Sequence, residues 1–192
     1  MNKIIFATGN KDKMKEIRMI LSDLDVEILS MKEAGISVDI EENGTTFEEN
    51  ALIKANAVAA YTDAIVLADD SGLEIDYLNK EPGVYSARYA GDAHNSEANM
   101  KKLLKDMEGI ENRKAQFRTV FVLIIDGKEH LFEGIVKGEI TKNRKGASGF
   151  GYDPIFIPEG YTQTFAEMGN ELKNKISHRA LATNKLCKFL MR

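Results

Sequence analysis

The stretch from Ala64 to Leu73 reads A-I-V-L-A-D-D-S-G-L, and the fold is predicted outward from it. It opens with four apolar residues, a pattern typical of a short strand that is buried on both faces. Asp69 and Asp70 follow at the expected C-terminal end of this strand, which is where open α/β sheets place their chemistry. The stretch therefore predicts a central strand with a candidate site at its end.

Two interpretations of Asp69 and Asp70 stay open on these residues alone. Adjacent carboxylates repel each other, and their burial without a counter-charge is unfavourable. A divalent cation would remedy this, and hard oxygen ligands favour Mg²⁺ or Mn²⁺ over Zn²⁺. Alternatively, the strand ends in an Asp-Ser-Gly turn that leaves both acids in water.

Length and composition predict one domain over residues 1–192. The 192 residues are 43% hydrophobic and 29% charged, which is ordinary for a soluble globular protein. Lys and Arg total 26 against 30 Asp and Glu, giving a net charge of -4. This balance argues against a nucleic-acid partner, which normally requires a basic domain, but allows a small anion held by local cations.

The cellular location is expected to be cytoplasmic. The single cysteine, Cys187, leaves no internal disulfide and fits a reducing compartment. The apolar run at the N-terminus is too short for a signal peptide, and no run is long enough to span a membrane. We therefore expect no membrane partner.

The N-terminal segment predicts a strand, a glycine turn and a helix. Residues 3–8 form the apolar run, Gly9 and Asn10 end it, and a helical pattern begins at Lys11. Such a turn offers backbone N–H groups and a partial positive charge to an anion. Neither G-x-x-x-x-G-K-[ST] nor G-x-G-x-x-G is present, so an ordinary turn with solvated lysines remains the alternative.

The remaining chain alternates between strand and helix patterns. Further helices are expected over residues 47–61, 96–107 and 165–190, the first opened by a T-x-x-E capping box. Asn95 or Ser96 could cap the second, whose apolar stripe is expected to be core: Met100, Leu103, Leu104 and Met107. Further strands are expected over residues 26–30, 73–78, 115–125, 130–141 and 155–158, with Asp126-Gly127 as a hairpin turn. The predicted class is α/β: a mixed sheet covered by helices, with a cleft between the sheet and a second lobe.

Three further segments carry candidate ligand groups. Glycines and aromatics alternate in S-G-F-G-Y-D-P from Ser148, where a base could stack, or where a tight turn simply packs. N-K-I-S-H-R from Asn174 gathers donors for phosphate or base oxygens, or forms a solvated helix face. Glu41 and Glu42 either lie in a solvated acidic turn or meet Asp70 and complete a metal site.

Taken together, six motifs resemble the non-standard purine nucleoside triphosphate pyrophosphatases, also called inosine triphosphate pyrophosphatases or XTP/dITP diphosphatases. They cover the chain nearly from end to end in the order of that family. The motifs are A-T-G-N-K-D-K (7–13), F-E-E-N-A-x-x-K-A (47–55), A-D-D-S-G-L (68–73), P-G-V-Y-S-A-R-Y-A-G (82–91), G-F-G-Y-D-P (149–154) and I-S-H-R (176–179).

The resemblance implies an elongated mixed sheet flanked by helices, with two lobes, a central substrate cleft and a homodimer. It implies Mg²⁺-dependent hydrolysis of ITP, dITP and XTP to the monophosphate and pyrophosphate, which would clear deaminated purines from the nucleotide pool. Selecting these bases over adenine requires donors aimed at the 6-oxo group.

The resemblance also implies roles for individual residues. Asp70 would be the catalytic carboxylate, and Glu41 with Asp70 would hold the metal, although a one-residue shift would put Glu42 there instead. The implied contacts with the purine nucleoside triphosphate are Thr8, Gly9, Asn10, Lys11, Asp12, Lys13, Lys54, Ser71, Phe150, Gly151, Tyr152, Asp153, Lys173, His178 and Arg179. Ser148 and Ala180 depart from the glycines that relatives often carry, which affects loop geometry only.

Two other functions are weighed against this one. A metal-dependent phosphomonoesterase would release phosphate instead of pyrophosphate. A nucleotide-binding module without catalysis would bind ITP without turnover, and the carboxylates argue against it.

Overall fold

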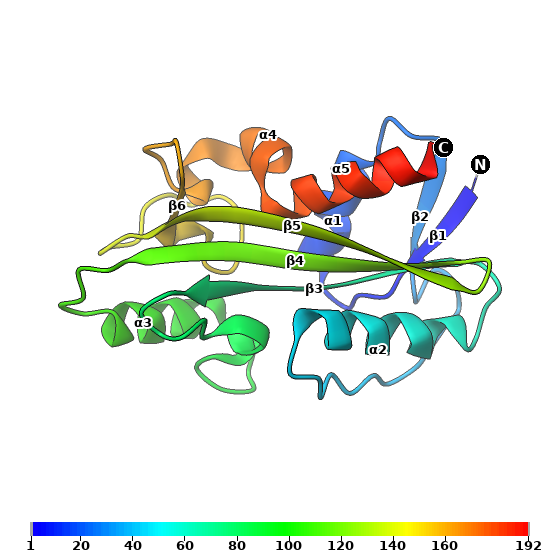
Figure 1. The fold of residues 1–192 in the computed structure, drawn as a ribbon, viewed down its shortest axis with the longest axis horizontal. Coiled ribbons are helices and arrows are strands. Elements are labelled where there is room, and N and C mark those ends of the chain that lie inside the picture. Colours follow the sequence, from blue (N-terminus) through cyan, green and yellow to red (C-terminus); the bar gives the residue numbers. More distant parts are fainter. Residues whose placement is uncertain (1, 192) are drawn as a thin grey trace. The chain divides into compact units, whose positions relative to one another are not determined.

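The computed structural model describes residues 2–191, whose strands form one six-stranded mixed sheet (Figure 1). Its strand order is β2-β1-β3-β4-β5-β6. The strands are β1 (Asn2–Phe6), β2 (Val26–Ser30), β3 (Ile65–Ile75), β4 (Lys114–Ile125), β5 (Lys128–Ile140) and β6 (Phe156–Pro158). Strand β1 pairs in parallel with β2 and β3, whereas β5 and β6 pair antiparallel. The predicted α/β class with a mixed sheet is confirmed.

Five α-helices lie between or after these strands in the described chain. They are α1 (Lys11–Ile20), α2 (Phe47–Ala59), α3 (Ser96–Asp106), α4 (Phe165–Ile176) and α5 (His178–Leu190). The predicted capping box of α2 is present, since Thr46 Oγ1 accepts from the Glu49 N–H and the Glu49 carboxylate accepts from the Thr46 N–H. Asn95 caps α3 as expected. None of the helices in residues 2–191 is long and apolar enough to cross a membrane.

The chain divides into two compact units. Unit 1 comprises Met1–Asp70, Thr119–Gly134 and Arg179–Arg192, and unit 2 comprises Ser71–Arg118 and Ile135–His178. Strands β3, β4 and β5 each contribute residues to both units. The predicted domain of residues 1–192 includes residues 1 and 192, which lie outside the described part.

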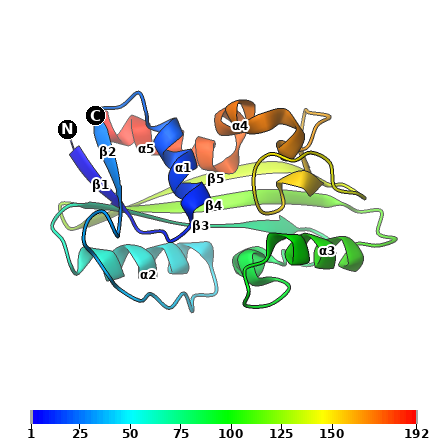
Figure 2. The same ribbon diagram turned by 180° about the vertical axis from the view of Figure 1, so that it is seen from behind.

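In unit 1, helices cover both faces of the strands (Figure 2). Ile4 and Phe6 of β1 pack with α1 and α5 on one face, while Ile5 packs with α2 on the other. Strand β3 alternates in the same way, with Leu67 facing α1 and α5 and its neighbours Val66 and Ala68 facing α2. This alternation follows from the two-residue period of a strand.

In unit 2, one core lies between the strands, α3 and α4. Leu73 and Ile75 of β3 pack in it with Met100 and Leu103 of α3. The aromatic part of this core is a cluster of Phe117, Phe156 and Phe165, whose ring centroids lie 4.6–5.9 Å apart. The predicted apolar stripe of α3 is therefore core, as expected.

The predicted break after Asp70 is wrong. Strand β3 runs without interruption from Ile65 to Ile75, so Asp69 and Asp70 lie inside it and Ser71-Gly72 forms no turn. Of the separate strand predicted over residues 73–78, residues 73–75 are the last part of β3 and residues 76–78 form a turn. The apolar pattern predicts that a strand ends where charged residues begin. Here the strand continues, because cations from elsewhere in the chain compensate the buried carboxylate of Asp69.

The final helical pattern also differs from its prediction. Two helices replace the single element expected over residues 165–190, because Ser177 is extended, with φ -66° and ψ 162°. Within α4, Gly169 has φ 78°, a left-handed conformation that interrupts the helix and that glycine adopts without strain. The predicted Asp126-Gly127 hairpin is confirmed, with both residues at positive φ, 50° and 70°.

Candidate active site

The alternation of β3 sends its two adjacent carboxylates to opposite faces of the strand. Asp69 is on the face of Leu67 and meets α1 and α5, whereas Asp70 is on the face of Ala68 and meets α2. Both are buried, with Asp69 fully enclosed and Asp70 8% exposed. Each carboxylate is thus balanced by its own set of neighbours within unit 1.

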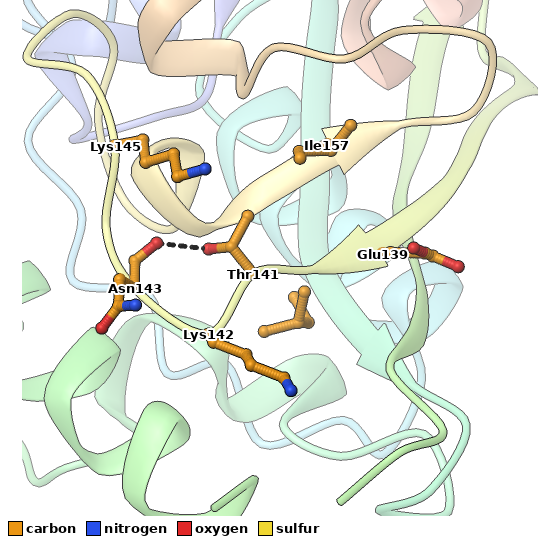
Figure 3. A pocket seen from close by; sticks show the side chains of 7 residues that line it. Glu139, Thr141, Lys142, Asn143, Lys145 and Ile157 are labelled. Atoms are coloured by element: carbon orange, nitrogen blue, oxygen red, sulfur yellow. Dashed lines mark hydrogen bonds between the residues drawn. The ribbon is translucent and has the colours of Figure 1, made fainter.

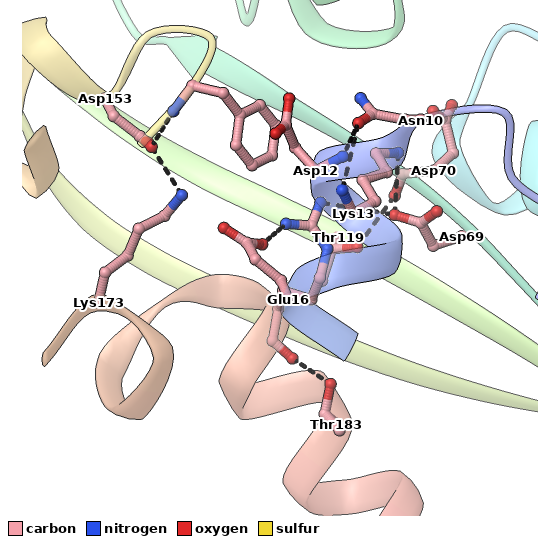
Figure 4. Close-up of polar contacts among 12 residues, drawn as sticks. Asn10, Asp12, Lys13, Glu16, Asp69, Asp70, Thr119, Asp153, Lys173 and Thr183 are labelled. Atoms are coloured by element: carbon pink, nitrogen blue, oxygen red, sulfur yellow. Dashed lines mark hydrogen bonds and ion pairs between the residues drawn. The ribbon is translucent and has the colours of Figure 1, made fainter. Parts of the chain in front are cut away.

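Asp69 is held by two cations. Its Oδ2 lies 2.9 Å from Lys13 Nζ and 3.6 Å from Arg179 Nη2 (Figure 4). Burial by itself would raise the pKa of Asp69, but Lys13, Arg179 and Lys54 together hold it below its ordinary value. Arg179 also pairs with Glu16 of α1. This network keeps Asp69 ionised and takes up part of the charge of Lys13 and Arg179.

Asp70 meets a neutral amide on α2. Asn50 Nδ2 donates to Asp70 Oδ2 at 3.0 Å, and Thr119 Oγ1 donates to the Asp70 backbone carbonyl at 3.3 Å. Burial raises the pKa of Asp70 above its ordinary value, against the opposing effect of Lys54 and Lys13. A raised pKa makes this carboxylate a better proton acceptor than an exposed aspartate.

Lys54 lies one turn after Asn50 on α2 and is 8% exposed. Its Nζ is 2.8 Å from Glu42 Oε1 in the acidic loop, which we define as residues 39–44. Burial lowers the pKa of Lys54, but Asp69, Glu42 and Asp70 raise it further, so that its net pKa is above the ordinary value. Lys54 is therefore a buried, charged group among carboxylates.

The turn predicted as a phosphate cradle starts α1. Asn10 is its N-cap, and Asn10 Oδ1 accepts from the N–H groups of Asp12 at 2.9 Å and Lys13 at 3.2 Å (Figure 4). Thr8 Oγ1 accepts from the Asn10 N–H at 3.1 Å. The strand–turn–helix prediction is confirmed, while the binding of phosphate there stays a prediction.

The donors around Asp70 fit a hard divalent cation that is shared with a substrate. Asp70 supplies a buried carboxylate that accepts from a neutral amide, and Glu41 or Glu42 could supply a second carboxylate. Among residues 2–191, no group of three His, Cys, Asp or Glu side chains is placed to hold a metal. Mg²⁺ is commonly bound by one or two carboxylates and substrate phosphates, which is compatible with this set.

The two candidate glutamates of the acidic loop differ in their surroundings. Glu41 is exposed, while Glu42 is partly buried and paired with Lys54. The predicted ligand Glu41 stays a prediction, and so does its alternative Glu42.

In unit 2, Asp153 and Lys173 form a buried ion pair. The distance from Lys173 Nζ to Asp153 Oδ2 is 2.6 Å, and the two residues are 1% and 3% exposed (Figure 4). The Phe150 N–H donates to the same Asp153 oxygen at 2.9 Å, and Lys173 Nζ lies 4.5 Å from the centroid of the Phe150 ring. Three residues that the resemblance assigns to the nucleotide are thereby brought together.

The close approach of the Asp153 carboxylate requires a glycine at position 149. Gly149 has φ 77°, and a Cβ there would lie 2.2 Å from Asp153 Oδ2. Tyr152, by contrast, points into the core, where its hydroxyl donates to the Ser86 carbonyl at 2.6 Å. Its 5% exposure leaves little of the side chain for a ligand, so any contact of Tyr152 with substrate would involve its backbone.

The remaining predicted site residues are divided between the two units. His178 belongs to unit 2, where its ring stacks on Phe117 at 4.9 Å and 11°. Arg179 belongs to unit 1 and lies in the Asp69 network. Lys11 and Asp12 are exposed on α1, and Ser71 is partly exposed. A Cβ added at Gly9 or Gly151 would have no neighbouring atom within 4 Å.

Two residues of this site had no assigned role in the sequence interpretation. Asn50 was only a polar residue on α2, and Glu16 was only part of the polar face of α1. No local pattern pairs Glu16 with Arg179, 163 residues later. Asn50 lies four residues before Lys54, but no sequence pattern pairs it with Asp70, twenty residues later.

Unit 2 also contains a surface cavity of about 330 Å³ (Figure 3). It is lined by Glu139, Ile140, Thr141, Lys142, Asn143, Lys145 and Ile157. Thr141 Oγ1 donates to the Asn143 carbonyl at 2.7 Å beside it. None of the residues that were predicted to bind substrate lines this cavity.

The chain is similar to curated bacterial proteins along its whole length. A protein of Porphyromonas gingivalis named dITP/XTP pyrophosphatase is 50% identical over 192 residues, covering 100% of this chain and 98% of that protein. One of the same name from Flavobacterium johnsoniae is 48% identical, covering 98% and 97%.

Solved structures agree with these sequence relatives. The Ham1 protein of Staphylococcus aureus is 42% identical with a TM-score of 0.90, covering 99% of this chain and 98% of that one. A HAM1 protein from Coxiella burnetii is 39% identical with a TM-score of 0.91, covering 100% and 99%. The model of the Ham1 family matches residues 4–189. The resemblance drawn from the motifs is confirmed, and the chain belongs to the Ham1 family.

Proposed function

We propose that this protein hydrolyses dITP, XTP and ITP to the nucleoside monophosphate and pyrophosphate, with Mg²⁺ as cofactor. It is an enzyme of the hydrolases that act on phosphoric anhydrides, as are its relatives named dITP/XTP pyrophosphatase. The observation that carries the proposal is the placement of Asp70, a buried carboxylate with a raised pKa, near the charges of Lys13 and Lys54.

The reaction requires water to attack the α-phosphorus while the bond from that phosphorus to the α–β bridging oxygen breaks. Asp70, a buried carboxylate, orients this water and accepts its proton. Lys13 and Lys54 offset negative charge on the departing pyrophosphate. Asp70 and Glu41, or Glu42 in its place, would hold Mg²⁺, which supplies charge stabilisation on the phosphate oxygens.

The selection of the base is assigned to buried donors. The candidate donors are His178 and Arg179, which the motif resemblance assigns to the substrate and whose side chains carry N–H groups. A 6-oxo group accepts hydrogen bonds from such donors, whereas the 6-amino group of ATP leaves them unpaired. A preference of this kind would remove deaminated purines from the nucleotide pool.

We also infer a cytoplasmic homodimer as the working form. The single cysteine and the absence of any pairing partner for it support a reducing compartment. The homodimer rests on the family resemblance, and size-exclusion chromatography with light scattering tests it.

The deciding experiment is product analysis with purified protein, Mg²⁺ and dITP, XTP or ITP, beside ATP and GTP. The expected products are monophosphate and pyrophosphate from the first three, with ATP and GTP nearly unchanged. Release of inorganic phosphate would favour the phosphomonoesterase alternative, and binding without turnover would favour the non-catalytic module. Asp70→Asn, purified in parallel, controls for contaminating phosphatases.

A further inference from the structure

We propose that Asn50 is a positioning residue for Asp70, and that one amide side chain fixes both this carboxylate and the end of the acidic loop. The inference rests on the proposed function, because Asp70 has its catalytic role there. It adds a residue that touches neither the reacting atoms nor the nucleotide, and it lies entirely within unit 1.

Asn50 makes two hydrogen bonds from opposite ends of its amide. Nδ2 donates to Asp70 Oδ2 at 3.0 Å, and Oδ1 accepts from the Gly44 N–H at 2.8 Å. The side chain is 2% exposed, so water does not compete for either bond. A carboxylate only accepts and a backbone N–H only donates, so the orientation of the amide is fixed by chemistry.

The sequence at Gly44 is adapted to this contact. A Cβ at position 44 would lie 2.6 Å from Asn50 Oδ1 and 2.7 Å from Glu49 Cβ. Gly44 has no positive φ, so the approach of Asn50 and Glu49, and not backbone strain, requires a glycine. The acidic loop is thereby held to the first turn of α2 at its last residue.

Helix α2 holds the acidic loop a second time, four residues further on. Lys54 Nζ lies 2.8 Å from Glu42 Oε1, and Lys54 and Asn50 share one face of the helix. Of the two α2 residues that hold the acidic loop, Asn50 is the one that also donates a hydrogen bond to Asp70. It therefore couples the orientation of the Asp70 carboxylate to the position of the loop that carries Glu41 and Glu42.

The expected consequence is a loss in the chemical step when the link is cut. A buried hydrogen bond to a charged group, if it fixes the reactive geometry, corresponds to roughly tenfold to hundredfold in kcat. We expect KM for dITP to change less than threefold, because Asn50 does not hold the nucleotide. We also expect weaker binding of Mn²⁺, a hard cation that can replace Mg²⁺ as a probe.

The test uses Asn50→Leu, which keeps the volume of the side chain and removes both hydrogen bonds. Asn50→Ala also removes both hydrogen bonds without adding a charge, so it serves if the leucine variant does not fold. The matched control is Asn56→Leu, on the same helix, where an exposed asparagine donates to Glu129 Oε1 at 3.0 Å. Each variant is checked by circular dichroism and thermal unfolding.

The readouts are kcat, KM for dITP, and Mn²⁺ affinity measured by electron paramagnetic resonance without nucleotide. Support requires at least a tenfold lower kcat and weaker Mn²⁺ binding in the Asn50 variant, with the Asn56 control at the wild-type level. A kcat within threefold of wild type in a folded Asn50 variant would overturn the proposal.

A double-mutant cycle with Gly44→Ala tests the path of the coupling. If the methyl group acts by displacing Asn50, Gly44→Ala lowers kcat alone but adds little in the Asn50→Leu background. Fully additive effects would refute the coupling. An inactive wild-type enzyme would instead refute the proposed function, so the two failures are distinguishable.

Discussion

Asp69 and Asp70 are chemically identical neighbours with opposite environments. Two cations hold the pKa of Asp69 below its ordinary value, whereas burial beside an amide raises that of Asp70. Such divergence is typical of a pair in which one carboxylate stabilises structure and the other performs chemistry. At the scale of single residues, the two should therefore respond differently to the same substitution.

The first prediction compares Asp70→Asn with Asp69→Asn. Asp70→Asn should abolish pyrophosphate release and leave the thermal midpoint near that of wild type. Asp69→Asn should destabilise the fold by roughly 3–5 kcal/mol, because it removes the carboxylate partner of Lys13 and leaves the buried Arg179 with Glu16 alone. Urea unfolding and pyrophosphate assays on both variants measure this. Near-normal turnover in Asp70→Asn would remove Asp70 from the mechanism.

The second prediction separates the two glutamates of the acidic loop. Glu42 is already paired with Lys54 at 2.8 Å, whereas Glu41 is exposed. Glu41→Gln should therefore raise the Mg²⁺ concentration for half-maximal activity more than Glu42→Gln does. Magnesium titrations of the hydrolysis rate compare them, and the reverse order would assign the ligand to Glu42.

At the scale of elements, the edge strand β2 is tied to α1 by a single arginine. Arg18 of α1 donates to the Ile28 carbonyl at 2.9 and 3.2 Å and to Glu33 Oε2 at 2.6 Å. The same Glu33 oxygen accepts from the Ser30 N–H at 2.7 Å, just where β2 ends. These bonds fix the end of an edge strand that has only β1 as a neighbour.

The third prediction follows from the pKa of Glu33. Hydrogen bonds from Ser30, and then Arg18, lower this pKa from 4.5 to about 2. A carboxyl with a lowered folded-state pKa stabilises the fold above its unfolded pKa, and this stabilisation is lost as the pH falls from 4.5 toward 2. Glu33→Gln should therefore be less stable than wild type at pH 7, with the difference vanishing by about pH 2.

Urea midpoints of wild type and Glu33→Gln between pH 7 and pH 2 measure this difference. Glu171→Gln is the control, since Glu171 is exposed and makes only a 3.3 Å pair with Lys175 four residues away. A difference for Glu33→Gln that is independent of pH would contradict the assigned cause.

At the scale of the whole molecule, three strands join the two units. The boundaries between the units fall inside β3, β4 and β5, so each of these strands belongs to both. A strand is stabilised along its length by its neighbours, and disruption of one half removes the hydrogen-bonding register of the other. We therefore expect the two units to unfold together.

The fourth prediction is a single calorimetric transition, with equal van't Hoff and calorimetric enthalpies. Leu67→Ala in unit 1 and Phe156→Ala in unit 2 should each lower the free energy of unfolding by about 2–5 kcal/mol, because both side chains are fully buried. Each substitution should shift the midpoint of the same single transition. Two resolved transitions, each shifted by only one of the substitutions, would show that the units unfold independently.

Local sequence determined most of the elements. The capping box at Thr46 and Glu49, the cap at Asn95 and the Asp126-Gly127 turn each act within a few residues, so pattern and structure agree there. The six motifs likewise indicate the family to which the chain belongs. Information of this kind is carried by neighbours in the chain.

The tertiary structure alone decided how the buried charges are paired. Nothing near Asp69 in the sequence predicts Lys13 and Arg179 as its partners, and the pair of Asp153 with Lys173 spans twenty residues. The continuity of β3 through its carboxylates depends on such remote counter-charges. The sequence thus determined most helices and strands and suggested the candidate residues, whereas folding decided their partners, because electrostatic compensation depends on distance in space.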